Sequence, residues 1–166
     1  PKSFYSIFPT AGNQLWVSAG SEDLYLMENG VVVTKKPVHG VKAILVDQKQ
    51  GVWLGCQNGL IRLTDTNLMN FSARGDLARI DVRALAEDRL GRIWIGTGDG
   101  RIHQFENGEF TSYQAGDELK NQAVWSLLPD EDGTIWIGTF RGGLLRLKDG
   151  KFTRYTTRNG LPSDVI

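Results

Sequence analysis

The side chains that most often perform catalysis are scarce in this sequence. It contains two histidines, His39 and His103, and a single cysteine, Cys56. A nucleophilic enzyme needs a nucleophile, a base and an orienting group in mutual reach, and neither histidine stands in such a set. We expect His39 in a loop and His103 in a strand. The sequence therefore predicts a region that is not an enzyme, with a lyase or hydrolase as the weakest alternative.

Metal-binding patterns are equally incomplete. The acidic run Asp130-Glu131-Asp132-Gly133 is similar to a calcium loop, but it lacks the later bidentate glutamate of an EF-hand. Pro129 also stands where the acidic box of sialidases has serine or threonine. The single cysteine offers no thiolate cluster for zinc. We interpret the run as a hairpin turn and expect no metal and no cofactor.

Cationic and aromatic side chains offer binding chemistry instead. Guanidinium and ammonium groups attract anions, and an indole face packs against a sugar ring or a cation. The candidate ligand-binding residues are Lys42, Arg83, Trp125, Asp99, Arg101 and Arg141. The plainer interpretation, that they are ordinary solvated loop residues, stays open at this point.

Composition restricts the class of partner. The chain has 166 residues, is 40% hydrophobic and 23% charged, and has a formal net charge of zero, which is typical of a folded domain. No run of like charge could follow a phosphate backbone, so nucleic acid is not an expected partner. No apolar stretch is long enough to span a bilayer, so we expect no membrane contact by this segment.

The elements that position these residues follow from an internal repeat. Four similar stretches, QLWVSAG, GVWLGCQNG, GRIWIGTGDG and GTIWIGTFRGG, recur about every forty residues. A second set of similar stretches precedes each of them: FYSIFPT, VKAILVD, VRALAED and VWSLLPD. The repeated tryptophans are Trp16, Trp53, Trp94 and Trp136. Their regular recurrence indicates packing rather than ligand binding, whereas Trp125 stands at a position that varies between copies.

Each copy contains four short runs rich in β-branched and aromatic residues, which predicts strands. Asn29-Gly30, Asn107-Gly108 and Asp149-Gly150 supply the positive φ of two-residue hairpins. Residues 81–90 have a helix-favouring composition, but their alignment with residues 124–133 predicts a strand there as well.

Four up-and-down strands in a repeat of this length are typical of a β-propeller blade. We therefore predict an all-β fold of four tandem four-stranded antiparallel meanders, with the tryptophans packed between blades and Gly96 and Gly138 allowing close approach. The predicted organisation is a single, partial propeller domain over residues 1–166. Its blades span approximately residues 4–40, 41–81, 82–123 and 124–164.

Residues 133–166 resemble the two-component regulator propeller repeat of bacterial sensor proteins. The resemblance is carried by G-x-I-W-I-G-T at residues 133–139, G-G-L-x-R at 142–146, D-G-x-F-x-x-Y at 149–155 and N-G-L-P-S-D at 159–164. Residues 91–113 repeat most of this pattern, and the first copy is degenerate.

The resemblance implies an extracytoplasmic, usually periplasmic, ligand-sensing region that signals through a membrane helix to a histidine kinase or a diguanylate cyclase. Family members commonly have seven blades, so four copies imply an open fragment, or a homodimer or larger assembly that forms through blade pairing, with two chains completing a ring. The expected ligand is an unknown small molecule, either a carbohydrate or an anion. A protein-interaction or self-assembly platform is the main alternative.

In a propeller the loops from fourth to first strands and from second to third strands gather at one end. The first group comprises residues 72–81 and 114–123, and the second contains Gln57, Asn58, Phe140 and three of the candidate binding residues. We therefore predict that a ligand binds at this loop-rich end, together with the first-strand residues Lys42, Arg83 and Trp125.

Overall fold

The structure, a computed structural model, describes residues 4–10, 13–19, 23–64, 67–71, 79–116, 119 and 122–166. In these residues the predicted all-β fold of propeller blades is confirmed, because the strands form four antiparallel four-stranded sheets. A single turn of 3-10 helix, η3 (Thr157–Asn159), follows the last strand. No described helix has the length and apolar character needed to cross a membrane.

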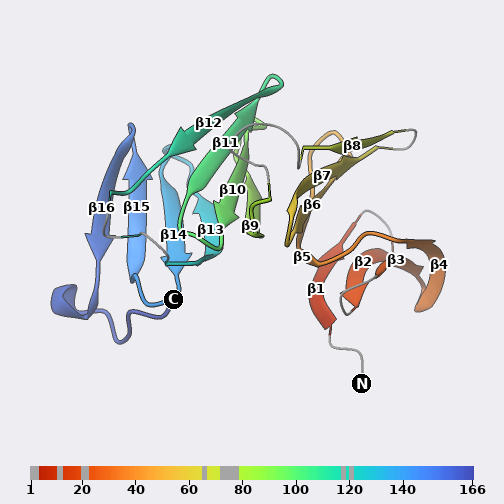
Figure 1. The fold of residues 1–166 in the computed structure, drawn as a ribbon, viewed down its shortest axis with the longest axis horizontal. Helices are drawn as coiled ribbons and strands as arrows, with labels where there is room; N and C mark the ends of the chain where they lie inside the picture. The colour runs from red at the N-terminus through yellow and green to blue at the C-terminus, as the bar shows by residue number, and fades with distance from the viewer. Residues whose placement is uncertain are drawn as a thin grey trace. The chain divides into compact units, whose positions relative to one another are not determined.

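Every sheet is a simple meander whose strands are neighbours in sequence order (Figure 1). The first contains β1 (Phe4–Pro9), β2 (Gln14–Ala19), β3 (Asp23–Glu28) and β4 (Val31–Lys36). The second contains β5 (Val41–Val46), β6 (Val52–Cys56), β7 (Gly59–Leu63) and β8 (Leu68–Asn70). The third contains β9 (Val82–Glu87), β10 (Ile93–Thr97), β11 (Ile102–Glu106) and β12 (Glu109–Tyr113). The fourth contains β13 (Val124–Pro129), β14 (Ile135–Thr139), β15 (Leu144–Lys148) and β16 (Lys151–Tyr155).

The chain divides into two compact units, residues 1–82 and 83–166, and each unit has its own interior. In the first unit the core includes Trp16, Leu24, Ile44 and Leu54, which come from the first and second sheets. In the second unit Trp94, Ile102, Val124, Ile135 and Leu145 pack between the third and fourth sheets. Membership of all four sheets in one propeller domain stays a prediction.

The predicted hairpin turns have the backbone that their sequences require. Asn29 and Gly30 have φ of 50° and 81°, Asn107 and Gly108 have 51° and 90°, and Asp149 and Gly150 have 50° and 73°. Two successive positive values characterise the turn whose twist matches that of the flanking strands. Residues 82–87 form β9 despite their helix-favouring composition, because the repeat places them against β10.

Glycines in the second strand of a blade allow the next blade's first strand to approach closely. A Cβ on Gly96 of β10 would lie 2.4 Å from Val124 Cγ1 of β13, and one on Gly55 of β6 would lie 2.6 Å from Val82 Cγ1. The predicted close approach at Gly96 is therefore real. At Gly138 the nearest atom is Ser126 Oγ, at 2.3 Å, with Ile166 Cγ2 at 3.2 Å.

We expect Gly96→Ala to lower the free energy of unfolding by about 1–3 kcal/mol, because the added methyl group overpacks the contact with Val124. Val124→Ala alone lowers it by a similar amount through the cavity it leaves. The double variant should lose at least about 1 kcal/mol less stability than the sum of the losses in the two single variants, since the smaller side chain makes room for the methyl group. Chemical denaturation of the four proteins measures this coupling, and strict additivity would show that the two residues do not form a mutual contact.

Candidate functional site

Two of the candidate binding residues lie at irregularities in strand pairing, near the start of the first strand of a sheet. In β5 the pairing with β6 skips from Val41 to Ala43, and in β13 the pairing with β14 skips from Val124 to Ser126. The skipped residues are Lys42 and Trp125. A bulge re-aims the side chain of its extra residue, which explains physically why this position varies between copies and is not part of the packing that the repeat conserves in every copy.

Trp125 belongs to a cluster of two aromatic rings and a guanidinium, which we call the aromatic–cation cluster. The ring centroids of Trp125 and Phe140 are 4.7 Å apart with an interplanar angle of 30°. The Arg141 guanidinium carbon lies 4.9 Å from the centroid of Phe140. Trp125 is 48% exposed, in contrast to 4% for Trp94, and Arg141 is also exposed. The cluster thus presents an indole and a cation to solvent.

The loop that carries the cluster, residues 140–143, is held by several hydrogen bonds. The Phe140 amide donates to Ala123 O at 2.8 Å, and Thr139 Oγ1 donates to Gly143 O at 2.7 Å. Arg154 Nε of β16 donates to Gly142 O at 2.7 Å. Arg141 itself has a φ of 69°, a conformation that side chains other than glycine adopt infrequently and that is concentrated at functional sites. These hydrogen bonds hold Phe140 and Arg141 of the cluster in a fixed arrangement.

Asp99 and Arg101, two of the predicted binding residues, form an ion pair with each other. Arg101 donates to Asp99 Oδ2 from Nε at 2.9 Å and from Nη2 at 2.6 Å, and Thr97 Oγ1 donates to Asp99 Oδ1. Burial opposes ionisation of Asp99, but these hydrogen bonds outweigh it and hold the pKa of the carboxyl below its ordinary value. The charges of Asp99 and Arg101 therefore compensate each other.

This pair and the aromatic–cation cluster border the same connecting segment. A Cβ on Gly100 would meet Leu119 O at 2.2 Å, and one on Gly142 would meet Leu119 Cδ2 at 3.0 Å. Both loops therefore contact the link between β12 and β13 at the loop-rich end of the second unit.

The remaining candidates lie at the starts of other first strands. Lys42 Nζ donates to Asp81 Oδ1 at 2.7 Å within the first unit, so its charge is also compensated. Arg83 follows the first residue of β9, in the second unit. Of the predicted loops, residues 72–78 and residues 117, 118, 120 and 121 lie outside the described residues.

Both histidines lie where the sequence predicts, His39 in a loop and His103 in a strand. His39 is exposed in the link before β5, whereas His103 is fully buried in β11, with Nδ1 2.9 Å from Ser112 Oγ. Burial raises the pKa of the Cys56 thiol to about 12, so the thiol stays protonated at neutral pH. Three or more potential metal ligands do not come together anywhere in the described part of the chain.

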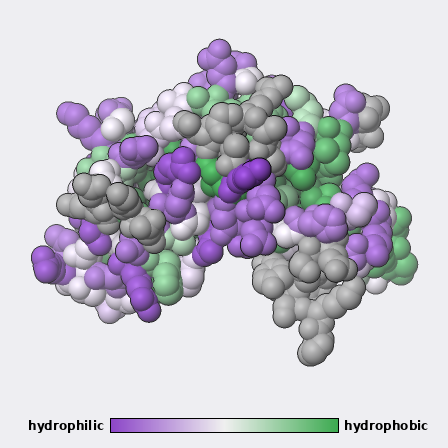
Figure 2. Space-filling view, in the orientation of Figure 1, coloured by the Kyte–Doolittle hydropathy of each residue, from purple (hydrophilic) through white to green (hydrophobic). Residues whose placement is uncertain are grey.

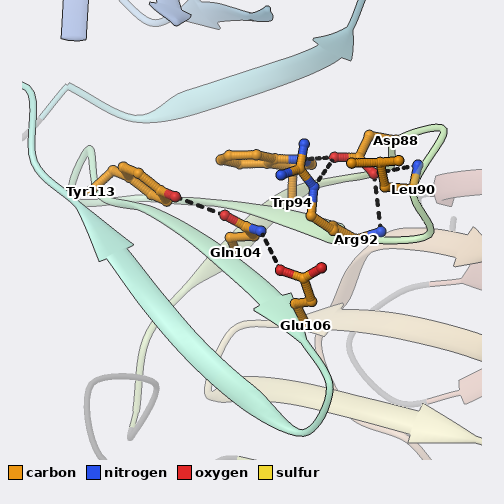
Figure 3. A network of polar contacts seen from close by, with 7 residues as sticks. All are labelled: Asp88, Leu90, Arg92, Trp94, Gln104, Glu106 and Tyr113. Carbon is orange, nitrogen blue, oxygen red and sulfur yellow. Dashed lines mark hydrogen bonds and ion pairs between the residues drawn. The ribbon is translucent and has the colours of Figure 1, made fainter. Parts of the chain in front are cut away.

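Sequence reasoning missed the partners of the buried indoles. Trp94 Nε1 donates to Asp88 Oδ2 at 2.8 Å, and the same oxygen accepts from Arg92 Nε at 2.6 Å. Asp88 Oδ1 accepts from the amides of Leu90 and Arg92, both at 3.0 Å. Figure 3 shows this carboxylate enclosed by its donors in the turn between β9 and β10. We call a carboxylate that binds both the indole and its own turn an indole clamp.

A second indole clamp has the same form. Asp47 Oδ2 accepts from Trp53 Nε1 at 2.8 Å and from Arg62 Nη2 at 2.7 Å, while Oδ1 accepts from the Gly51 amide at 2.7 Å. Burial opposes ionisation of Asp47 and of Asp88. Hydrogen bonds from the indole, the turn amide and the arginine nevertheless keep the pKa of each carboxyl below its ordinary value. Each guanidinium also lies near the indole, at 4.9 Å for Arg62 and 5.7 Å for Arg92.

The fourth sheet has a weaker clamp. Trp136 Nε1 donates to Asp130 Oδ2 at 3.4 Å, and Asp130 is exposed. The turn is the predicted hairpin, since the Gly133 amide donates to Asp130 O at 3.2 Å. Trp136 is accordingly only half-buried, in contrast to Trp53 and Trp94.

A cleft of about 240 Å³ lies at the opposite, hairpin-turn end of the second unit. Trp94, Ile135 and Leu147 are among its lining residues, with Tyr113 and Gln104 beside them. Tyr113 Oη donates to Gln104 Oε1 at 2.7 Å, and Gln104 Nε2 donates to Glu106 Oε2 at 3.3 Å (Figure 3). None of the six predicted binding residues lines this cleft.

Comparison with known families supports the resemblance on sequence. Residues 76–99 and 118–141 match the family described as Two component regulator propeller. Each matched segment contains one IWIGT run and its preceding first strand. The predicted resemblance is therefore confirmed, on these two segments. No curated protein matches the chain.

Several solved structures share the fold. The extracellular domain of a hybrid two component system from B. thetaiotaomicron has a TM-score of 0.84 and 24% identity, covering 99% of this chain and 24% of that one. The extracellular domain of a one component system from the same organism has a TM-score of 0.82 and 22% identity, covering 100% of this chain and 24% of that one. Virginiamycin B lyase from Staphylococcus aureus has a TM-score of 0.78 and 16% identity, covering 96% of this chain and 58% of that one. The chain thus spans about a quarter of the length of the two extracellular domains.

We expect Asp88→Asn to lower the free energy of unfolding at neutral pH by about 2 kcal/mol, because the amide nitrogen would face the donors of Trp94 or Arg92. The low pKa of Asp88 means that its stabilisation is complete above the unfolded pKa near 3.9 and is lost as the pH falls through the folded pKa. The variant should therefore lose less stability on acidification. Asp130→Asn is the matched control, with an expected cost below about 0.5 kcal/mol; equal losses in the two variants, measured by denaturation from pH 7 to pH 2, would contradict the clamp.

Proposed function

We propose that this chain is the ligand-sensing propeller region of a bacterial signal-transduction protein and that it is not catalytic. The single observation that carries the proposal is the exposed aromatic–cation cluster of Trp125, Phe140 and Arg141, on a fold whose repeated tryptophans are buried at Trp16, Trp53 and Trp94. Among the described residues no carboxylate forms an ion pair with Arg141. A ligand that covers both the exposed indole and this guanidinium would therefore gain contacts with each.

The chemistry of the cluster favours a carbohydrate that carries an anionic group. Trp125 offers a flat apolar face about the size of a sugar ring, and the Phe140 ring holds the Arg141 guanidinium beside it. Asp99 and Arg101 compensate each other, and Lys42 is paired with Asp81. We assign the anion to Arg141, because its guanidinium lies over the Phe140 ring that packs against the exposed Trp125.

We infer a location and a mode of assembly from the same comparisons. The two solved extracellular domains with this fold support an extracytoplasmic, periplasmic location for the chain. We also propose that ligand binding biases the packing of blades, either with further blades or with a second chain, and that this change reaches a histidine kinase or a diguanylate cyclase in a longer protein.

A propeller enzyme is the second candidate, because a lyase shares the fold at 16% identity. Against it, His103 is fully buried in β11, and His39 is exposed in the link before β5. A protein-interaction platform is the third candidate. A partner that buries more than about 1,000 Å² against the loop-rich end would favour it over small-ligand sensing.

We expect oligogalacturonate to bind the chain and its fully methyl-esterified, neutral form to bind at least about tenfold more weakly, since the ester removes the charge that Arg141 pairs with. Trp125→Ala and Arg141→Gly should each weaken the binding by about tenfold or more. Glycine accepts the positive φ of residue 141, so Arg141→Gly should not lower stability. Isothermal titration calorimetry and thermal denaturation provide the two readouts.

Arg89→Ala is the matched control, because it removes an exposed arginine from the hairpin-turn end of the same unit. Its affinity should equal that of the unchanged chain. If neutral and anionic oligosaccharides both fail to bind, or if Arg89→Ala weakens binding as much as Arg141→Gly, the proposed site is wrong. Turnover of the oligosaccharide during the titration would favour the enzyme instead.

A further inference from the structure

The outer strand of the first sheet has an unusual surface. β4 pairs with β3 alone, so its outer edge has no neighbouring strand among the described residues. Its first three residues are consecutive valines, Val31, Val32 and Val33, with exposed fractions of 65%, 49% and 51%. We call these three residues the valine edge. Figure 2 shows hydrophobic residues on the surface over β4, at the right-hand side of the view.

The same position in other sheets is polar or too short. In β12 the exposed residues are Glu109, Thr111 and Ser112, and in β16 they are Lys151 and Thr153. β8 exposes Leu68 and Met69 but has only three residues. Apolar exposure over a longer outer strand is therefore particular to β4. An apolar edge strand of high β-propensity is a template for pairing with another chain.

The two ends of β4 carry opposite charge. Glu28 of β3 pairs with Val31, which places a carboxylate beside the start of the strand. Lys36 ends the strand and is exposed. Lys35 is already compensated, because its Nζ lies 3.2 Å from Asp23 Oδ2 and over the ring of Tyr25. The strand is thus acidic near its first residue, apolar in its first half and basic at its end.

We propose that the valine edge is an interface between two copies of this chain, paired antiparallel through β4. Antiparallel pairing brings the basic end of one strand to the acidic end of the other in both halves of a two-fold contact. This self-complementarity identifies a second copy as the occupant, in preference to an unrelated peptide. The inference is independent of the proposed ligand-sensing function and uses the first unit alone.

The register with the best charge match pairs Val31 with Lys36 of the second copy. Paired residues share a face of the sheet, so Glu28, Val31 and that lysine lie in one row across three strands. The row spans about 10 Å between the outer Cα atoms, within the combined reach of the lysine and glutamate side chains. The lysine stem would cover Val31 while its ammonium group meets the Glu28 carboxylate.

The contact is expected to be small and weak. Val32 pairs with Met27 and Thr34 with Leu26, so Val33 is the extra residue of a bulge. A bulge interrupts the regular row of backbone groups at an edge, which limits the length of strand that can pair. We expect a reversible dimer with a Kd between about 10 μM and 1 mM, as for interfaces at the low end of the size range.

Sedimentation equilibrium over this concentration range tests the proposal with the chain and four sets of variants. Val32→Lys should weaken dimerisation by at least about tenfold, whereas Thr111→Lys, the same change on the outer strand β12, should leave it unchanged. Glu28→Lys and Lys36→Glu should each weaken it, and the double charge reversal should restore it to within about threefold of the original. Leu128→Lys, on β13 of the other unit, should have no effect.

The restoration by the double reversal is the decisive result, because neither misfolding nor general hydrophobic association can produce it. The proposal is overturned if the chain stays monomeric to about 1 mM, if Val32→Lys and Thr111→Lys behave alike, or if the double reversal is as weak as the single ones. If Leu128→Lys alone abolishes the dimer, copies pair through their blade faces and not through β4. That outcome leaves the ligand-sensing proposal standing.

Discussion

The rest of the structure depends on the hydrogen bond between a buried indole and a turn carboxylate. A tryptophan that packs between sheets removes a large apolar area from water, but its N–H group needs an acceptor once buried. Asp47 and Asp88 supply that acceptor and at the same time accept from the amides of their own turns. One carboxylate thus fixes the turn between first and second strands and the depth of the indole together. Where the bond lengthens, at Asp130, the indole of Trp136 is also more exposed.

This arrangement separates the two ends of a blade. The clamps lie at the hairpin-turn end, where their carboxylates, backbone amides and arginines hydrogen-bond one another and stabilise the fold. At the loop-rich end, Trp125 is released from pairing by a bulge and joins Phe140 and Arg141 in a supported loop. A rigid scaffold with chemistry on its loops is the usual division of labour in binding domains. The second unit therefore combines a fixed frame with one exposed aromatic and cationic surface.

The internal repeat allowed the strands, the sheets and the hairpin turns to be predicted from the sequence. Recurrent tryptophans, glycines that admit the next strand, and Asn-Gly and Asp-Gly turns specified the sheets. The variable position of Trp125 showed that this residue is not part of the repeated packing. The clamps were missed, although an aspartate stands six residues before Trp53, Trp94 and Trp136. Their arginines could not have been aligned, because Arg62 comes from β7 and Arg92 from the turn before β10. The pairing of Asp99 with Arg101 likewise depends on side-chain geometry that spacing does not encode.

The central claim is that turn carboxylates hold the indoles of Trp53 and Trp94 inside, and that of Trp136 less firmly, while Trp125 is free for a ligand. Hydrogen exchange of the five indole N–H groups, followed by NMR, tests it most directly. The account predicts that the Trp53 and Trp94 signals persist longest, that Trp136 exchanges sooner and that Trp125 exchanges at once. Equal exchange at all five indoles, or strong protection at Trp125 in the absence of ligand, would contradict it.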